Sequence, residues 1–133
     1  MSSSTGIAYD SQTSNLYIVD SNNNRVMQYQ YGASVGNVTA GGHGYGLSTS
    51  QLSTPVGLYF DTFSNSLVIS NYNMPRIVWW RIGDYNGTIV GITGVIGTNM
   101  TLLNQPCWVT LDKQLNLYVS DTSNHRVQMF KRY

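Results

Sequence analysis

The sequence is poor in charged residues and contains a single cysteine. Charged residues make up 10% of its 133 residues, glutamate is absent, and seven Lys and Arg against six Asp leave a net charge of +1. Proteins that bind nucleic acid carry a strongly basic surface, and this net charge is too small to indicate one. We therefore do not expect nucleic acid as a partner. The one cysteine, Cys107, excludes an internal disulfide and a zinc site built from cysteines.

Long hydrophobic runs are missing as well. No segment reaches the roughly 18 consecutive apolar residues that a transmembrane helix needs, and residues 1–5 lack the basic and apolar parts of a secretory signal. We therefore expect a soluble domain with no membrane partner. Sequons at Asn37, Asn86 and Asn99 hint at a secreted or extracellular parent protein, and the localisation is otherwise open.

What the sequence does contain is an internal repeat of about 50 residues. Aspartates and arginines mark its matching positions, which are 50 or 51 residues apart: Asp10, Asp61 and Asp112, and Arg25, Arg76 and Arg126. A period of this length with strand-like runs is typical of stacked β architectures, in which each unit buries its faces against its neighbours. We place the units at residues 6–55, 56–106 and 107–133 of a single segment that covers 1–133.

Each unit divides into short strand-like runs separated by turn residues. The first two units supply four such runs and the last supplies three. Apolar residues on both alternating faces, as in Leu16–Val19 and Ile77–Trp80, indicate sheets that are covered on both sides. We therefore expect an all-β fold of four-stranded antiparallel blades, as in a β-propeller.

Two segments resemble the NHL repeat, and so do the lead-ins before two of the units. The segments are Leu16–Val26 and Leu117–Phe130, and the lead-ins are Leu52–Pro55 and Leu103–Pro106. The second unit departs from the pattern, because Asn71 replaces the acidic residue and Pro75 precedes Arg76. The resemblance implies a β-propeller, commonly of six blades in this family, that binds protein, RNA or small ligands. A few related six-bladed propellers are enzymes.

About two and a half repeats do not close a propeller, which needs four blades or more. Two chains with three inner-strand units each would give the six blades common in the family. We therefore expect a homodimer that closes a six-bladed ring and covers the faces of the end blades. The positions of the two ends of the chain also favour a truncated or engineered propeller fragment.

Three pairs of residues lie at the ends of a tight connection between the second and third strands: Asp20 with Arg25, Asn71 with Arg76, and Asp121 with Arg126. We expect a charge-assisted hydrogen bond that holds each turn, and the alternative is a ring of arginines that binds an anion. The aspartates that end the inner strands are expected to accept hydrogen bonds from turn amides. Their alternative role is calcium binding at the channel mouth.

The inner strands also contain positions whose residues vary sharply in size from unit to unit. Gly6, Gly57 and Trp108 are equivalent to one another, and so are Ala8, Tyr59 and Thr110. Such variation marks places where a channel wall could set specificity. The residues that we expect to line the channel are Ala8, Tyr59, Trp108 and Thr110.

Candidate chemistry is sparse in this sequence. Neither His43 nor His125 has a second ligand at metal-binding spacing, no serine lies in a nucleophile elbow, and Gly41–Gly46 lacks the ending of a phosphate loop. We expect no catalytic, cofactor-binding or metal-binding residues. The function that we expect is a non-enzymatic scaffold and binding module, with itself and a protein or small ligand as partners. The alternatives are a fragment of a propeller hydrolase or lyase with a channel metal, and an RNA-binding NHL module.

Overall fold

The computed structural model describes residues 4–90 and 102–131, which form three antiparallel sheets that we call blades 1, 2 and 3. Blade 1 contains β1 (Ser4–Asp10), β2 (Asn15–Asp20), β3 (Arg25–Tyr29) and β4 (Asn37–Gly41). Blade 2 contains β5 (Pro55–Asp61), β6 (Ser66–Asn71), β7 (Arg76–Arg81) and β8 (Thr88–Val90). Blade 3 contains β9 (Pro106–Leu111), β10 (Leu117–Asp121) and β11 (Arg126–Phe130). Short 3-10 turns, η1 (Ser21–Asn23) and η2 (Thr122–Asn124), join the second and third strands of blades 1 and 3.

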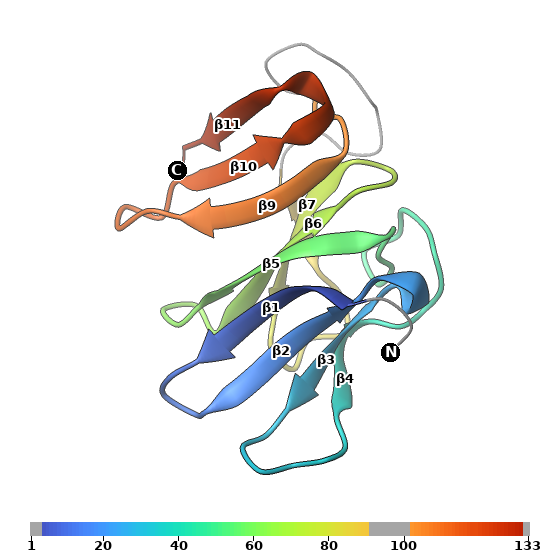
Figure 1. Ribbon diagram of the computed structural model, residues 1–133, viewed down its shortest axis with the longest axis vertical. Coiled ribbons are helices and arrows are strands. Elements are labelled where there is room, and N and C mark those ends of the chain that lie inside the picture. Colours follow the sequence, from blue (N-terminus) through green and yellow to red (C-terminus); the bar gives the residue numbers. More distant parts are fainter. Residues whose placement is uncertain (1–3, 91–101, 132–133) are drawn as a thin grey trace.

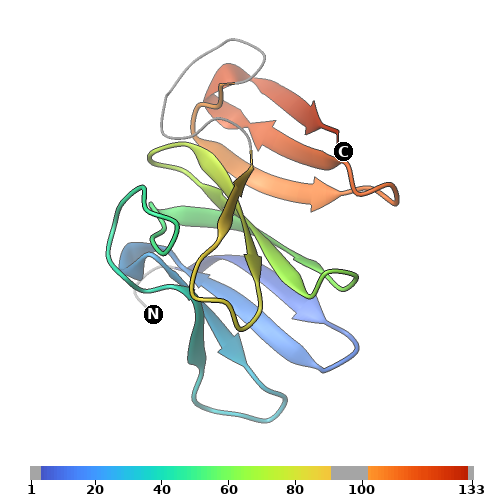
Figure 2. The same cartoon turned by 180° about the vertical axis from the view of Figure 1, so that it is seen from behind.

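The three blades are stacked face to face along the long axis of the molecule (Figure 1). Each blade is a meander whose strands follow chain order, and the innermost strands β1, β5 and β9 lie next to one another. From behind, the crossover of residues 42–54 runs from the outer edge of blade 1 past blade 2 (Figure 2). The all-β blade architecture predicted from the repeat is therefore present. The strand expected at Thr88–Gly91 extends over Thr88–Val90, and the residues from Gly91 to Thr101, with the sequon at Asn99, lie outside the described residues.

The repeat fixes the same strand register in each blade. Ile7 pairs with Ile18 in blade 1, Leu58 pairs with Ile69 in blade 2, and Val109 pairs with Val119 in blade 3. Since side chains alternate between the two faces of a strand, residues at matching repeat positions point to matching sides of their blades. Contacts at one junction between blades can therefore be compared directly with those at the next.

The hydrophobic core lies between the blades. One buried cluster joins blades 1 and 2 and includes Tyr17, Val19, Phe60 and Trp80, and a second cluster joins blades 2 and 3. Every residue of β6 is buried, because blade 2 has a blade on each side. This packing explains why the strands are apolar on both faces, as expected for sheets covered on both sides. In the described part of the chain, no helix is long and apolar enough to cross a membrane.

Candidate functional site

Two of the three predicted turn pairs form ion pairs. Arg25 donates from Nε to a carboxylate oxygen of Asp20 at 2.9 Å, and Arg126 donates in the same way to Asp121 at 2.7 Å. Both carboxylates are buried, and the Asp121 side chain also accepts the backbone N–H of Asn104 at 2.6 Å. Each carboxylate thus holds its arginine and the 3-10 turn together, as charge-assisted hydrogen bonds do in buried turns.

The expected pairing is wrong in blade 2. The Asn71 side chain accepts the Ser53 backbone N–H and donates to the backbone carbonyl of Arg76, and no carboxylate in the described part of the chain pairs with the guanidinium. Arg76 is fully buried, with 0% of its surface exposed, and donates instead to the carbonyls of Gly46 (2.9 Å), Leu47 (2.6 Å) and Gln51 (2.5 Å). Its Nε has no hydrogen-bond partner among the described residues. Burial without a counter-ion lowers the pKa of Arg76.

The alternative of an anion-binding ring of arginines finds no support in this geometry. Arg25 and Arg126 are engaged by buried aspartates, and Arg76 lies wholly inside the protein, where its guanidinium faces carbonyl groups of the crossover. These arginines therefore hold the turns and the crossover in place, as the structural interpretation of the repeat predicts.

The aspartates at the ends of the inner strands accept turn amides. Asp10 accepts the backbone N–H of Gln12 at 2.9 Å, Asp61 accepts that of Phe63 at 3.2 Å, and Asp112 accepts that of Gln114 at 2.9 Å. The hydrogen bond from the Thr13 hydroxyl is the main cause that lowers the pKa of Asp10, and the Asn116 side chain does the same for the pKa of Asp112. These carboxylates hold hairpin turns, as expected from their positions.

The inner strands come close to one another at two glycines. A Cβ atom built at Gly6 would lie within 3.0 Å of the Val56 carbonyl oxygen, and one built at Gly57 would lie within 3.0 Å of the Cys107 carbonyl oxygen. Real Cβ atoms do not come so near, so glycine is required where β1 meets β5 and where β5 meets β9. Trp108 occupies the equivalent position on β9 and has 54% of its surface exposed.

The other positions predicted to line a channel differ in their surroundings. Ala8 is half-buried against the cluster between blades 1 and 2, and Tyr59 is half-buried against the cluster between blades 2 and 3. Thr110, like Trp108, is exposed on β9. Ala8 and Tyr59 thus contribute to junctions between blades, whereas Thr110 and Trp108 lie on the side of blade 3 that faces away from the other described blades.

Blade 1 has an uncovered apolar face, which we call the blade 1 end face. Ile7 on this face has 61% of its surface exposed, whereas its equivalent in blade 2, Leu58, is 5% exposed. The residues of this face match, in register, the residues with which blade 2 packs on blade 1. They are Ile7, Tyr9, Leu16, Ile18, Met27 and Tyr29, of which Met27 is itself buried, and their blade 2 equivalents are Leu58, Phe60, Leu67, Ile69, Val78 and Trp80.

Blade 3 presents the opposite kind of face, which we call the blade 3 end face. Val127 has 69% of its surface exposed there, whereas its equivalent in blade 2, Ile77, is buried against blade 3. The residues of this face are Trp108, Thr110, Tyr118, Ser120, Val127 and Met129, and their blade 2 equivalents are Gly57, Tyr59, Val68, Ser70, Ile77 and Trp79. Comparing each position with its counterpart in blade 2, which lies 51 residues later for blade 1 and 50 or 51 residues earlier for blade 3, is the sequence signal that identifies both end faces.

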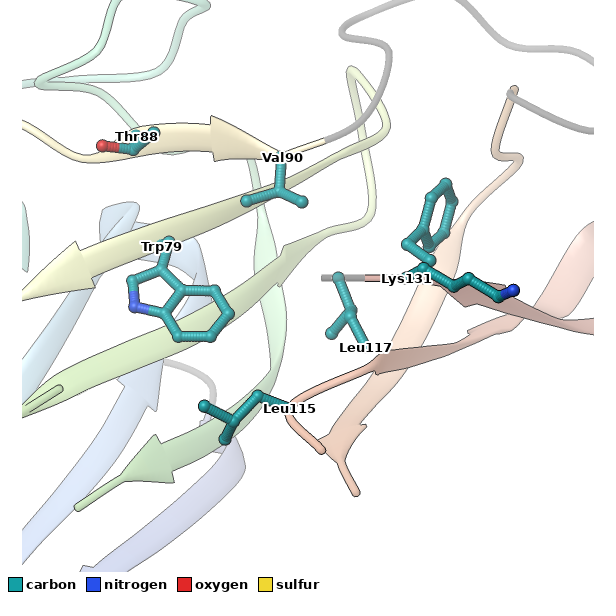
Figure 3. Close-up of a pocket in the computed structure, with 7 residues that line it drawn as sticks. Trp79, Thr88, Val90, Leu115, Leu117 and Lys131 are labelled. Carbon is teal, nitrogen blue, oxygen red and sulfur yellow. The ribbon is translucent and has the colours of Figure 1, made fainter. Parts of the chain in front are cut away.

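An apolar cleft lies between blades 2 and 3, and sequence reasoning missed it. It has a volume of about 370 Å³ and is lined by Trp79, Thr88, Val90, Leu115, Leu117, Phe130 and Lys131. In Figure 3, Trp79 of blade 2 lies across the cleft from Leu115 and Leu117 of blade 3, and the Lys131 amine is at one side. Apolar walls with a single cation suit a small apolar molecule that bears a negative group.

The remaining polar candidates have local partners. The His43 ring lies 4.7 Å from the ring of Tyr85, and Cys107 is a half-buried thiol near the Gln105 carbonyl. Within residues 4–90 and 102–131, no three His, Cys, Asp or Glu side chains are grouped so that they could hold a metal ion.

Comparison with solved structures shows that this arrangement of blades recurs in longer proteins. A protein of unknown function from Bacteroides thetaiotaomicron VPI-5482 matches 87% of this chain with a TM-score of 0.64 and 19% identity. An auxiliary nutrient binding protein from Bacteroides ovatus ATCC 8483 matches 91% of it with a TM-score of 0.66 and 16% identity. The chain spans only 30% and 35% of the lengths of those two proteins, and no curated protein matches its sequence.

The family comparison identifies the repeat itself. Residues 103–130 match the NHL repeat, and they comprise the lead-in of blade 3 and its three strands. The same register and the same turn pair recur in blade 1, and the register recurs in blade 2. Blade 3 therefore matches the NHL repeat, and the chain as a whole is similar in fold to NHL-repeat β-propellers.

Proposed function

We propose that this chain is a non-enzymatic propeller module that binds partners and self-assembles as a homodimer, in which two copies close a six-bladed ring. In this assembly the blade 3 end face of each copy packs on the blade 1 end face of the other. A twofold pair of copies then has two identical junctions and no uncovered blade.

The observation that carries this proposal is the match between exposed and buried residues at equivalent positions. The blade 1 end face repeats the face with which blade 2 packs on blade 1, but Ile7 and Tyr9 are exposed where Leu58 and Phe60 are buried. Burying a fully exposed side chain of this size is worth about 1.5–3 kcal/mol. Because the second junction closes within an already formed complex, the two junctions reinforce each other.

The side chains best suited to chemistry support a non-enzymatic role. Asp20 and Asp121 hold arginines, and Asp10 and Asp112 hold turn amides. Propellers often carry function in sites added to the fold, so the fold itself does not require catalysis.

For the binding role, the cleft between blades 2 and 3 is the ligand site that we propose. The Bacteroides ovatus neighbour, a nutrient binding protein, supports a ligand-binding use of this fold. Hexanoate combines an apolar chain with a carboxylate, and its binding can be followed through tryptophan fluorescence, to which Trp79 in the cleft contributes together with Trp80 and Trp108. We expect saturable quenching that is weakened in Lys131→Met. Unsaturable quenching, or equal quenching in the variant, contradicts this site.

Self-assembly is tested by placing a charge on an end face. Ile7→Asp puts a carboxylate where the proposed junction is apolar, so we expect its mass in solution, measured by light scattering, to fall to that of one chain. Phe63→Asp is the matched control, because Phe63 is an exposed apolar residue in the loop after β5 and lies on neither end face. Equal association of Ile7→Asp and Phe63→Asp would contradict the proposed junction.

A further inference from the structure

At the junctions inside the chain, the backbones of neighbouring inner strands approach closely at a glycine, and blade 3 has no glycine at that position. At the junction between blades 2 and 3, the Ser70 hydroxyl accepts the Gly57 N–H at 2.8 Å and donates to the Cys107 carbonyl at 2.8 Å. This bridge is possible because Gly57 has no Cβ that would meet the Cys107 carbonyl. A hydroxyl and a glycine thus join one inner strand to the next.

Blade 3 keeps the hydroxyl of this bridge and loses the glycine. The Trp108 N–H donates to the Ser120 hydroxyl at 2.8 Å, as Gly57 donates to Ser70, so the two backbones are equivalent. Ser120 has no acceptor for its own proton among residues 4–90 and 102–131. The repeat places Cys107 of blade 3 at the position of Val56 in blade 2 and of Thr5 in blade 1. The acceptor that blade 1 of a second copy would offer to Ser120 is therefore the Thr5 carbonyl oxygen.

Trp108 prevents this bridge from forming between copies. Trp108 has a Cβ atom at the position where Gly57 has none. If a second copy packed on blade 3 as blade 3 packs on blade 2, its Thr5 carbonyl oxygen would come too close to this Cβ atom. The junction must therefore open. An opening of about 0.5–1 Å already forfeits roughly a quarter to a half of each dispersion contact, and this loss extends over the whole end face.

We infer that Trp108 is the residue that sets the spacing and the strength of the junction between copies, and that it makes this junction wider and weaker than those inside the chain. The partner is a second copy, met at its β1 around Thr5 and Ile7. This inference rests on the proposed self-assembly. It adds that a single side chain, Trp108, prevents the blade 3 end face from packing on a second copy as closely as blades pack within the chain.

Two substitutions at one position separate this role from others. Trp108→Gly restores the close approach and the bridge from Ser120, so the dimer dissociation constant, measured by analytical ultracentrifugation, is expected to fall about tenfold. Trp108→Ala removes the indole but keeps the Cβ, so it leaves the dimer no tighter than the wild type. Adding Ser120→Ala to Trp108→Gly removes part of the gain. Near-ultraviolet circular dichroism checks that each variant is folded, since glycine weakens a strand.

The outcomes distinguish this inference from the proposed function. If the wild type is a dimer and Trp108→Gly weakens it or leaves it unchanged, the spacer role is overturned while self-assembly stands. Tightening by Trp108→Ala equal to that by Trp108→Gly also overturns the role assigned to the Cβ. If the wild type stays monomeric but Trp108→Gly dimerises, the spacer role holds and the proposed wild-type dimer fails.

Discussion

The ring of Tyr17 in blade 1 stacks on the ring of Phe60 in blade 2, with centroids 5.1 Å apart and ring planes inclined by 19°. The repeat places Tyr118 at the position of Tyr17 on the blade 3 end face, and Tyr9 at the position of Phe60 on the blade 1 end face. The equivalent aromatic pair therefore faces across the proposed junction between two copies, at the wider spacing that Trp108 sets.

Tyr118 of one copy and Tyr9 of the other are expected to couple across the junction. Tyr118→Ala and Tyr9→Ala should each weaken the dimer, and the double variant should lose less than the sum of the two. We expect a coupling of about 0.5–1.5 kcal/mol at each of the two junctions, which is typical of aromatic pairs. Dimer dissociation constants of the wild type, the two single variants and the double variant, measured by analytical ultracentrifugation, give this double-mutant cycle. Strictly additive changes in the free energy of dimerisation would show that the two rings do not meet.

A carboxylate at position 71 should stabilise the fold. Asn71→Asp keeps the acceptor for the Ser53 N–H and supplies a charged acceptor next to Arg76, whose Nε has none within residues 4–90 and 102–131. We expect the free energy of unfolding in urea to rise by about 1–2 kcal/mol, the range for a hydrogen bond to a charged group. In an Arg76→Met background the same substitution should give no gain. Destabilisation by Asn71→Asp in the wild-type background would contradict this account of Arg76.

The reverse change in blade 3 should destabilise the protein. Asp121→Asn makes the turn resemble that of blade 2, and it removes the charged acceptor of the Arg126 guanidinium from a buried position. The expected loss is about 1.5–3 kcal/mol of unfolding free energy. Thr122→Ala, at an exposed neighbour in η2, is the control that should change stability little. Equal small effects of both variants would mean that the ion pair contributes nothing.

The free energy of unfolding should fall in acid because the turn aspartates Asp10 and Asp112 become protonated. Hydrogen bonds lower the folded-state pKa of Asp10 and Asp112 below the ordinary value of 3.8. The unfolded chain then binds more protons than the folded chain, so the stabilisation is present above pH 3.8 and is lost as the pH falls below it. In the double variant Asp10→Asn with Asp112→Asn, the free energy of unfolding should depend less steeply on pH between about pH 4 and 2 than in the wild type. An unchanged slope would contradict the assigned pKa shifts.

Most of the fold could be predicted because the repeat presents the same pattern three times. The apolar run Leu16–Val19 is part of β2, and the pairing of Asp20 with Arg25 follows from complementary charges across a short turn. Such local signals survive in the folded chain because neighbouring blades bury both faces of each sheet.

The behaviour of Arg76 and Trp108 could not be predicted from spacing alone. Arg76 occupies the same repeat position as Arg25, yet its guanidinium binds carbonyls about 25–30 residues earlier in the chain, in a crossover whose path the sequence does not reveal. The meaning of Trp108 depends on how closely β5 and β9 approach, which is a property of packing between blades. The cleft beside Trp79 likewise arises only when two blades meet.

The absolute mass in solution tests the central claim most directly. Light scattering over a range of concentrations should give a mass near two chains of 14.8 kDa, with the fraction of dimer rising with concentration as mass action requires. A folded protein that keeps the mass of one chain at every concentration would contradict closure of a six-bladed ring by two copies.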